Sequence, residues 1–353
     1  MNFGKVLKYN INLNTGNPGN IDIYRDSRYT ANMRIHLPNS AFLGNIDPFL
    51  RTFETSSPDI LEITANEKWI SVHPVVLSMI GALGALIKPS NIRCSKLEAK
   101  SKHYLYRMGL FKILNIPSDI QIVEHDPAGR FIPITQICTS GELTKFITEM
   151  IPLLHLDPEQ AKTIGYIVSE LVRNVIEHAN SNYGAFLCAQ YYVKSNTIRI
   201  GIADAGVGIK TTINQSYSAK TDLEAIRLAL WPGITGTTRR EGGTEQNAGA
   251  GLFFIKSIAG VNRDFFIIYS GAAFYKLLRR PSSSRLRLNA DPFKDRHSID
   301  EKLPFWQGTI VGIDITLAQT EAFSHLLDAI RKTYTDAVKE RKKKTNYRKP
   351  KFI

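Results

Sequence analysis

The fold is decided by the stretch DPEQAKTIGYIVSELVRNVIEHA, residues 157–179. Asp157 is a favourable N-cap, Pro158 suits the first helical position, and Glu159 favours the positive end of a helix. The stretch therefore predicts a helix of about 22 residues. Apolar side chains recur along it at helical spacing and predict a stripe that faces the core. They are Ala161, Ile164, Val168, Leu171, Val172 and Val175.

Polar side chains follow a second line of the same helix. Glu170, Asn174, Glu177 and His178 lie at positions i, i+4, i+7 and i+8. A carboxylate and a carboxamide one turn apart suit a hydrated metal, because the amide oxygen can ligate Mg²⁺ while the carboxylate orients a water. An ordinary amphipathic helix with a polar face is the alternative, and the helix alone does not decide between the two interpretations.

A strand with glycines at its end follows about 25 residues later. TIRIGIADAGVGI, residues 197–209, predicts a strand that ends in Asp204, Gly206 and Gly208. An aspartate at a strand end can accept a hydrogen bond from an exocyclic amine. The two glycines allow the backbone to approach a flat ring or a phosphate. This segment therefore predicts one wall of a ligand pocket.

A glycine turn then leads into another helix. In NAGAGLFFIKSIAG, residues 247–260, Gly249 and Gly251 precede a helix that starts near Leu252. Such a turn presents free N–H groups and the positive helix end to a phosphate. The common phosphate motifs are absent: the sequence has no G-x-x-x-x-G-K-[ST], and Phe254 stands where a dinucleotide fingerprint has its third glycine.

The order of these segments resembles one family. A helix with E-x-x-x-N, a strand with D-x-G-x-G and a helix that starts with G-x-G-L resemble the GHKL superfamily of ATP-binding domains, which includes gyrase, histidine kinases and mismatch-repair ATPases. Gln307-Gly308-Thr309, which leads into IVGIDITL, is similar to the final strand of that fold, the Bergerat fold. The resemblance covers roughly residues 130–317 and is closest to the histidine-kinase and anti-sigma-factor branch. It implies an α/β sandwich with a mixed sheet and helices on one face.

The resemblance implies ATP and Mg²⁺ as cofactors, and it implies roles for single residues. Glu170 would orient or activate a water, Asn174 would ligate Mg²⁺, and Asp204 would bind the adenine amino group. The other implied ATP contacts are His178 near the triphosphate, Gly206 and Gly208 shaping the pocket, Gly249, Gly251 and Leu252 presenting backbone to the phosphates, and Thr309 acting through water. For His178, a packed core histidine is the alternative.

The residues between Gly208 and Gly249 are expected to form an ATP lid. TDLEAIRLALWPGI predicts a helix that ends at Trp231 and Pro232, and GTTRREGGTEQNAG predicts a glycine-rich loop. Four side chains of this loop are candidate phosphate contacts when the lid closes, although exposed loop residues without a ligand are the alternative. They are Thr237, Thr238, Arg239 and Arg240.

A separate small α/β unit is predicted before the ATP-binding domain. Strands over MRIHLP and ILEITA, a buried helix over 75–87 and an amphipathic helix over 103–116 resemble the STAS domain of anti-sigma antagonists. Antagonists carry a phosphorylatable serine after an aspartate, whereas Ser71 here has no such aspartate. The predicted organisation, of α/β (α+β) class, is as follows: an arm over 1–32, a STAS-like domain over 33–122, the ATP-binding domain over 128–320, and a helix with a basic tail over 321–353.

Charge and composition limit where the protein is expected to be located and what it is expected to bind. Residues 331–353 carry ten basic and two acidic side chains, which is +8 of the net charge of +13, so this tail could bind nucleic acid or an acidic membrane surface, or be merely solvated. Three widely spaced cysteines, Cys94, Cys138 and Cys188, favour a reducing compartment. The N-terminus lacks a signal-peptide pattern, and the apolar stretch 69–87 is interpreted as a core helix. The expectation is a cytoplasmic protein without a membrane segment.

Three functions fit these features. The first is a Mg²⁺-dependent ATPase whose lid closure switches the binding of a regulatory protein partner or dimerisation. The second is a protein serine/threonine kinase like the anti-sigma factors, and the third is a non-catalytic ATP-dependent adaptor whose basic tail binds nucleic acid. A histidine kinase is disfavoured, because His125 and His155 lie outside any helical hairpin that could hold a phosphoacceptor. In each case the chain is expected to act in signalling.

Overall fold

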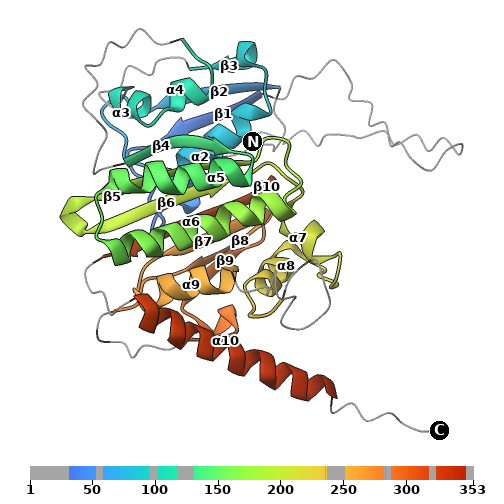
Figure 1. Ribbon diagram of the computed structural model, residues 1–353. Coiled ribbons are helices and arrows are strands. Elements are labelled where there is room, and N and C mark those ends of the chain that lie inside the picture. The colour runs from blue at the N-terminus through green and yellow to red at the C-terminus, as the bar shows by residue number, and fades with distance from the viewer. Residues whose placement is uncertain are drawn as a thin grey trace, which may run out of the picture.

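Two β-sheets and the helices that cover them make up the protein (Figure 1). The structure is a computed structural model, and it describes residues 32–52, 59–94, 102–117, 131–234, 236, 251–281, 283, 288–317 and 323–346. One sheet has three strands in the order β1-β2-β3, and the other has seven in the order β4-β5-β6-β10-β7-β8-β9. The predicted α/β (α+β) class is confirmed.

All pairings in the large sheet are antiparallel. Its strands are β4 (Phe131–Ile137), β5 (Ala185–Tyr192), β6 (Thr197–Ala203), β7 (Phe266–Gly271), β8 (Ala273–Leu277), β9 (His297–Asp300) and β10 (Trp306–Thr316). The resemblance implied a mixed sheet, but the parallel pairings among the described residues lie in the small sheet instead. Short connections join β5 to β6 and β7 to β8, and such connections suit antiparallel rather than parallel pairs.

Helices of the expected ATP-binding domain cover one face of the large sheet. They are α5 (Ser140–Lys145), α6 (Pro158–His178), α7 (Gly208–Ile213), α8 (Asp222–Ala229) and α9 (Gly251–Val261). Helix α6 begins as predicted, with a capping box in which the Asp157 side chain accepts a hydrogen bond from the Gln160 N–H at 2.9 Å. Its apolar stripe is buried in the core between helices and sheet.

The sequence also predicts a helix over 142–154, and in the structure this segment is divided into three parts. After α5 come a π turn over Phe146–Met150 and a 3-10 turn over Ile151–Leu154. Pro152 lies in the last part. A proline lacks an N–H and crowds the carbonyl four residues earlier, so regular α-helix cannot continue through it.

The small unit contains β1 (Asn32–Leu37), β2 (Ile60–Ala65) and β3 (Ile92–Arg93), paired in parallel. Its helices are α1 (Asp47–Leu50), α2 (Pro74–Ala85), α3 (Lys102–Arg107) and α4 (Leu110–Ile113), with a 3-10 turn over Pro89–Asn91. The helix predicted over 103–116 is divided at Gly109, whose φ of 77° is left-handed and ends α3. The two predicted strands are confirmed.

Helix α2 joins the two sheets. Its residues from Pro74 to Gly84 are buried, and it packs on β5, β6 and β10 of the large sheet. One apolar core therefore contains side chains of the small unit, such as Ile35, and of the large sheet, such as Phe186 and Ile310. The expected boundary between residues 122 and 128 lies outside the described residues, but the core on either side of it is continuous.

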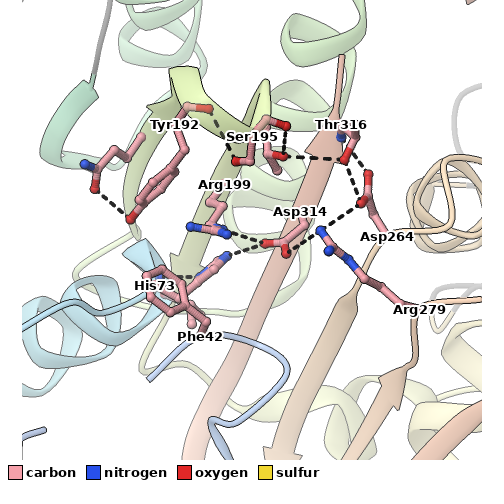
Figure 2. Close-up of polar contacts among 12 residues, drawn as sticks. Phe42, His73, Tyr192, Ser195, Arg199, Asp264, Arg279, Asp314 and Thr316 are labelled. Carbon is pink, nitrogen blue, oxygen red and sulfur yellow. Dashed lines mark hydrogen bonds and ion pairs between the residues drawn. The ribbon is translucent and has the colours of Figure 1, made fainter. Parts of the chain in front are cut away.

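A buried imidazole attaches the start of α2 to β10 (Figure 2). The Nδ1 atom of His73 accepts a hydrogen bond from the Val75 N–H at 3.1 Å and so caps the helix. The ring therefore donates through Nε2, which lies 3.2 Å from Oδ1 of Asp314. Burial lowers the pKa of His73, although Asp314 opposes this effect. The helix is thus held by a neutral histidine.

A guanidinium completes this polar contact between the units (Figure 2). The Arg199 guanidinium lies 4.3 Å from the ring centre of Phe42 and 4.0 Å from that of Tyr192. Its Nε lies 3.4 Å from Oδ1 of Asp314. Arg199 therefore neutralises the buried carboxylate while its guanidinium packs against a ring of the small unit and a ring of the large sheet.

Much of the predicted basic tail is helical. Helix α10 (Phe323–Asn346) contains seven of the ten basic residues in 331–353, and the others lie outside the described residues. The helix packs on α9 and α6, with Ile330 fully buried and the Tyr334 ring 6.1 Å from that of Phe254. Among the described residues, no helix is long and apolar enough to cross a membrane.

Candidate functional site: a cavity between α6, α7, α9 and the sheet

A cavity of about 350 Å³ lies between α6, α7, the start of α9 and the adjoining ends of β6 and β10. Segments far apart in the sequence meet there. Eight predicted site residues line it: Glu170, Asn174, His178, Asp204, Gly208, Gly251, Leu252 and Thr309. Three others, Thr237, Thr238 and Gly249, lie outside the described residues, as do Arg239 and Arg240.

Glu170 brings a carboxylate to the start of α9. A Cβ atom added at Gly251 would lie only 2.4 Å from Oε2 of Glu170, so the glycine allows the first turn of α9 to approach the carboxylate. Burial raises the pKa of Glu170, while the positive charge of Arg173 opposes this and Glu177 adds to it. The result is a half-buried carboxylate that binds a proton more readily than an exposed one.

Asn174 lies one turn further along α6 and also lines the cavity. Its amide Nδ2 atom is buried and has no hydrogen-bond partner among the described residues. Buried amide groups are normally satisfied by protein or water, so an unsatisfied one beside a cavity is expected to have its partner in the cavity.

Asp204 is fixed through its backbone and one side-chain oxygen. Its N–H donates to the Thr309 carbonyl at 2.9 Å, and its carbonyl accepts from the Trp306 indole at 3.1 Å. Oδ1 accepts from the Gly206 N–H at 2.7 Å. Burial raises the pKa of this carboxyl to about 7, against the lowering effect of the Gly206 and Thr309 hydrogen bonds. The side chain is 1% exposed and borders the cavity.

Gly206 does not line the cavity, and a glycine is needed at this position because a side chain would not fit. A Cβ atom there would lie 2.1 Å from the Ala179 carbonyl oxygen, at the end of α6. The Val207 N–H donates to the same carbonyl at 2.7 Å. Gly206 thus shapes the pocket only indirectly, by letting the chain after β6 pass close to the end of α6.

The polar face of α6 forms one wall of the cavity, and His178 belongs to it. Its Nε2 lies 3.9 Å from the Glu177 carboxylate, and the side chain is 20% exposed. A histidine packed wholly in the core, the alternative interpretation, does not fit this position.

Other lining residues were not predicted. Tyr166 precedes Glu170 by one turn of α6, so the spacing that identified Glu170 and Asn174 could have identified it too. Thr212 lies on α7, and its hydroxyl donates to the Gly208 carbonyl at 3.2 Å. No pattern in the sequence identified α7 as a helix, and Thr212 was missed for that reason.

The described residues contain no group of three or more His, Cys, Asp or Glu side chains that could hold a metal ion. Any cation at this site would therefore need ligands in addition to the described His, Cys, Asp and Glu side chains, such as those of a bound molecule or water. Asn174 and Glu170 supply one amide and one carboxylate, a set that suits Mg²⁺ better than softer metals.

Comparison with known proteins agrees with this geometry. Residues 139–261 match the sequence model of the histidine kinase-like ATPase domain, a segment that runs from the cap of α5 to the end of α9. No curated protein shows a significant match to the chain. The STAS-like resemblance of residues 33–122 stays a prediction. The segment that supplies α6, the end of β6, α7 and the start of α9 to the cavity is thus similar to a histidine kinase-like ATPase domain.

Proposed function

We propose that the protein binds ATP with Mg²⁺ in this cavity and hydrolyses it. One observation carries the proposal: a buried aspartate, a carboxamide, a carboxylate and a helix start line a single cavity, although they come from β6, α6 and α9. Adenine, a magnesium ion and phosphates need groups of these kinds.

The adenine ring is proposed to lie beside Asp204. An ionised carboxylate accepts a hydrogen bond from an exocyclic amine, and Oδ1 is already engaged by Gly206. Apolar side chains offer flat surface for a ring on the cavity wall, among them Ile202, Ile209 and Ile213. Thr309 lies next to Asp204 and would assist through a water.

The phosphates are proposed to lie at the start of α9. This helix has 11 residues, and Gly251 and Leu252 at its start line the cavity. Free N–H groups and the helix dipole favour phosphate at such a position. Gly249, Thr237 and Thr238 are proposed to complete this part of the site, with His178 on the opposite wall.

Mg²⁺ is proposed to bind through the Asn174 amide oxygen. The residues fit this ion, because Asn174 and Glu170 bring one amide oxygen and one carboxylate to the cavity, and Mg²⁺ commonly takes few protein ligands together with water and substrate phosphates. When bound, the ion would neutralise charge on the phosphates. Asn174 positions it on the α6 side of the cavity.

Glu170 is proposed as the general base. Its raised pKa brings the carboxylate closer to the value at which a base accepts a proton efficiently near neutrality. It lies beside Gly251, where the terminal phosphate would be. Glu170 would accept the proton of a water as that water attacks the terminal phosphorus and the bond from this phosphorus to the departing oxygen of ADP breaks.

Residues 208–249 are proposed to act as a lid whose closure changes the binding of a regulatory protein partner or of a second copy. The described part already contacts other elements. The Arg227 guanidinium of α8 pairs with Asp291 at 2.6 Å and lies 4.6 Å from the ring centre of Phe293. These contacts fix the part of the lid around α8, so that closure would involve the rest of it.

Incubation of the full chain with γ-labelled ATP and Mg²⁺ tests the proposal. Release of labelled phosphate without labelled protein is the expected result. Transfer of the label to another protein would instead identify a protein kinase, and binding without either product would identify an adaptor. Absence of ATP binding would overturn the proposed function altogether.

A further inference from the structure

Helix α10 has a buried face and an exposed face on opposite sides. Ile330 is fully buried and Val338 nearly so, while the Tyr334 ring lies 6.4 Å from that of Phe253. These positions share the side of the helix that packs on α9 and α6. The helix is therefore attached to the protein by its apolar side chains.

Three lysines form a row on the opposite side. Lys332, Lys339 and Lys343 follow one another at spacings of seven and four, which places them on one line of a helix, where the exposed Asp336 lies between the first two. At 100° per residue this line is about half a turn from Ile330 and Tyr334. All three side chains are exposed, and within the described part of the chain none has an acidic partner. We call them the lysine row.

We propose that the lysine row binds the phosphate backbone of a nucleic acid. From Lys332 to Lys343 the row extends about 16 Å, which corresponds to roughly five base-pair steps of a duplex. Fixed, exposed ammonium groups gain affinity by displacing the counterions of closely spaced phosphates. The row carries no base-reading geometry, so the binding is independent of nucleotide sequence.

A membrane surface is a poorer partner for the same helix. A helix that lies in a membrane interface inserts a free apolar face between lipid headgroups. The apolar face of α10 is already packed against α9. Among the side chains that the structure describes, the large exposed apolar ones lie on other elements, such as Trp69, Val193 and Phe305. The charge of α10 is thus available to a partner, whereas its hydrophobic surface is not.

The test compares two triple variants of the full chain. One is K332Q/K339Q/K343Q. Its matched control, K68Q/K88Q/K112Q, removes the same charge from exposed positions of the small unit. Fluorescence anisotropy with a labelled duplex of about 20 base pairs, between about 50 and 200 mM salt, gives affinity and salt dependence. Circular dichroism melting and ATP binding confirm that both variants remain folded.

The lysine-row variant is expected to lose at least about tenfold in affinity, and its log–log salt slope should fall in magnitude by about 2.7, or 0.9 for each lost phosphate contact. The control variant should keep both the affinity and the salt slope of the parent protein. Equal losses in the two variants would show a general charge effect and overturn the site. So would the absence of duplex binding by the parent, or binding only to phosphatidylserine vesicles. Complete loss on truncation after Asn346, with the lysine-row variant unaffected, would also overturn it.

Discussion

The proposed contact between Asp204 and adenine would link nucleotide binding to pH. The pKa of about 7 reflects burial, and the ionised carboxyl accepts a hydrogen bond from an adenine amine more strongly than the protonated one does. We expect the affinity for adenosine, which has no group of its own titrating near neutrality, to fall as the pH is lowered through 7, by up to about tenfold per unit. Isothermal titration from pH 5.5 to 8.5 measures this dependence.

The same experiment on Asp204→Asn provides the control. The amide cannot ionise, so the pH dependence should disappear, and affinity at pH 8 should fall about 10- to 100-fold because a charged hydrogen bond is lost. Unchanged affinity in the variant would remove Asp204 from the adenine site. The stability of the protein without ligand depends on pH in the opposite direction. The Asp204 carboxyl titrates near 3.8 in the unfolded chain and at about 7 in the folded protein, so its contribution to the free energy of unfolding decreases as the pH rises from about 4 to 7.

Glu170→Gln is expected to spare ATP binding and to lower turnover about 100-fold or more, because the amide cannot accept a proton from water. Phosphate release and ATP affinity are measured on the same preparation. Glu159→Gln is the matched control, because Glu159 lies exposed at the other end of α6 and pairs with Lys162. Parent-like turnover in Glu170→Gln would refute the assignment of the general base.

Single site residues could be predicted from the sequence where the residues that define them lie close together along the chain. Glu170 and Asn174 were found because their spacing along one helix is visible in the sequence. The contact between Trp306 and the Asp204 carbonyl joins residues about 100 positions apart, and nothing in either segment indicates it. Local periodicity therefore identified one cavity wall, while the way the walls meet required the structure.

At the scale of elements, α2 and β6 approach so closely that only glycine fits between them. A Cβ atom at Gly201 would lie 2.1 Å from the Val75 backbone nitrogen. We expect Gly201→Ala to lower the free energy of unfolding by about 3 kcal/mol, because a helix backbone cannot yield as a flexible side chain can. Urea titration followed by circular dichroism measures the loss.

Gly165→Ala on α6 is the control for that substitution. A Cβ atom there would lie 3.8 Å from the Ile151 side chain, an ordinary contact, and alanine is the better helix former. Its expected effect is a stabilisation of about 0.5–1 kcal/mol. A loss of similar size in both variants would mean that the approach of α2 to β6 is not the cause.

Helices were predicted best where capping residues mark their ends. The start of α6 followed from Asp157 and Pro158, and the structure confirms its capping box. The breaks at Gly109 and before Pro152 were missed because apolar periodicity continues across both, although each residue is itself a signal against a continuous helix. The spacing of apolar residues shows which face of a helical segment is buried, but it does not show whether that segment is one helix or two.

At the scale of the whole molecule, the apolar core crosses the predicted boundary between the two units. A fragment over residues 131–346 would expose the side chains of β5, β6 and β10 that now pack on α2. We expect this fragment to aggregate or to unfold without cooperativity, although it contains the whole match to the ATPase domain. Size-exclusion chromatography and thermal melting compare it with the full chain.

A monomeric fragment with a sharp melting transition would contradict that prediction. The sequence indicated that α2 is buried, since it is apolar throughout, but not which surface buries it. Two packed units with one shared core and two units with separate cores have the same pattern of apolar residues. Long-range contacts such as that between Val75 and Gly201 decide between them.

The position of α2 also has a consequence for synthesis on the ribosome. The helix ends at Ala85, whereas β10, one of the strands that bury it, begins only at Trp306. At roughly 5–20 residues per second, about 10–45 seconds separate the emergence of the two. Throughout that interval the nascent chain carries an apolar helix without its final partner. A chaperone that binds the nascent chain is thus expected to matter most for the N-terminal half of the protein, which contains this helix.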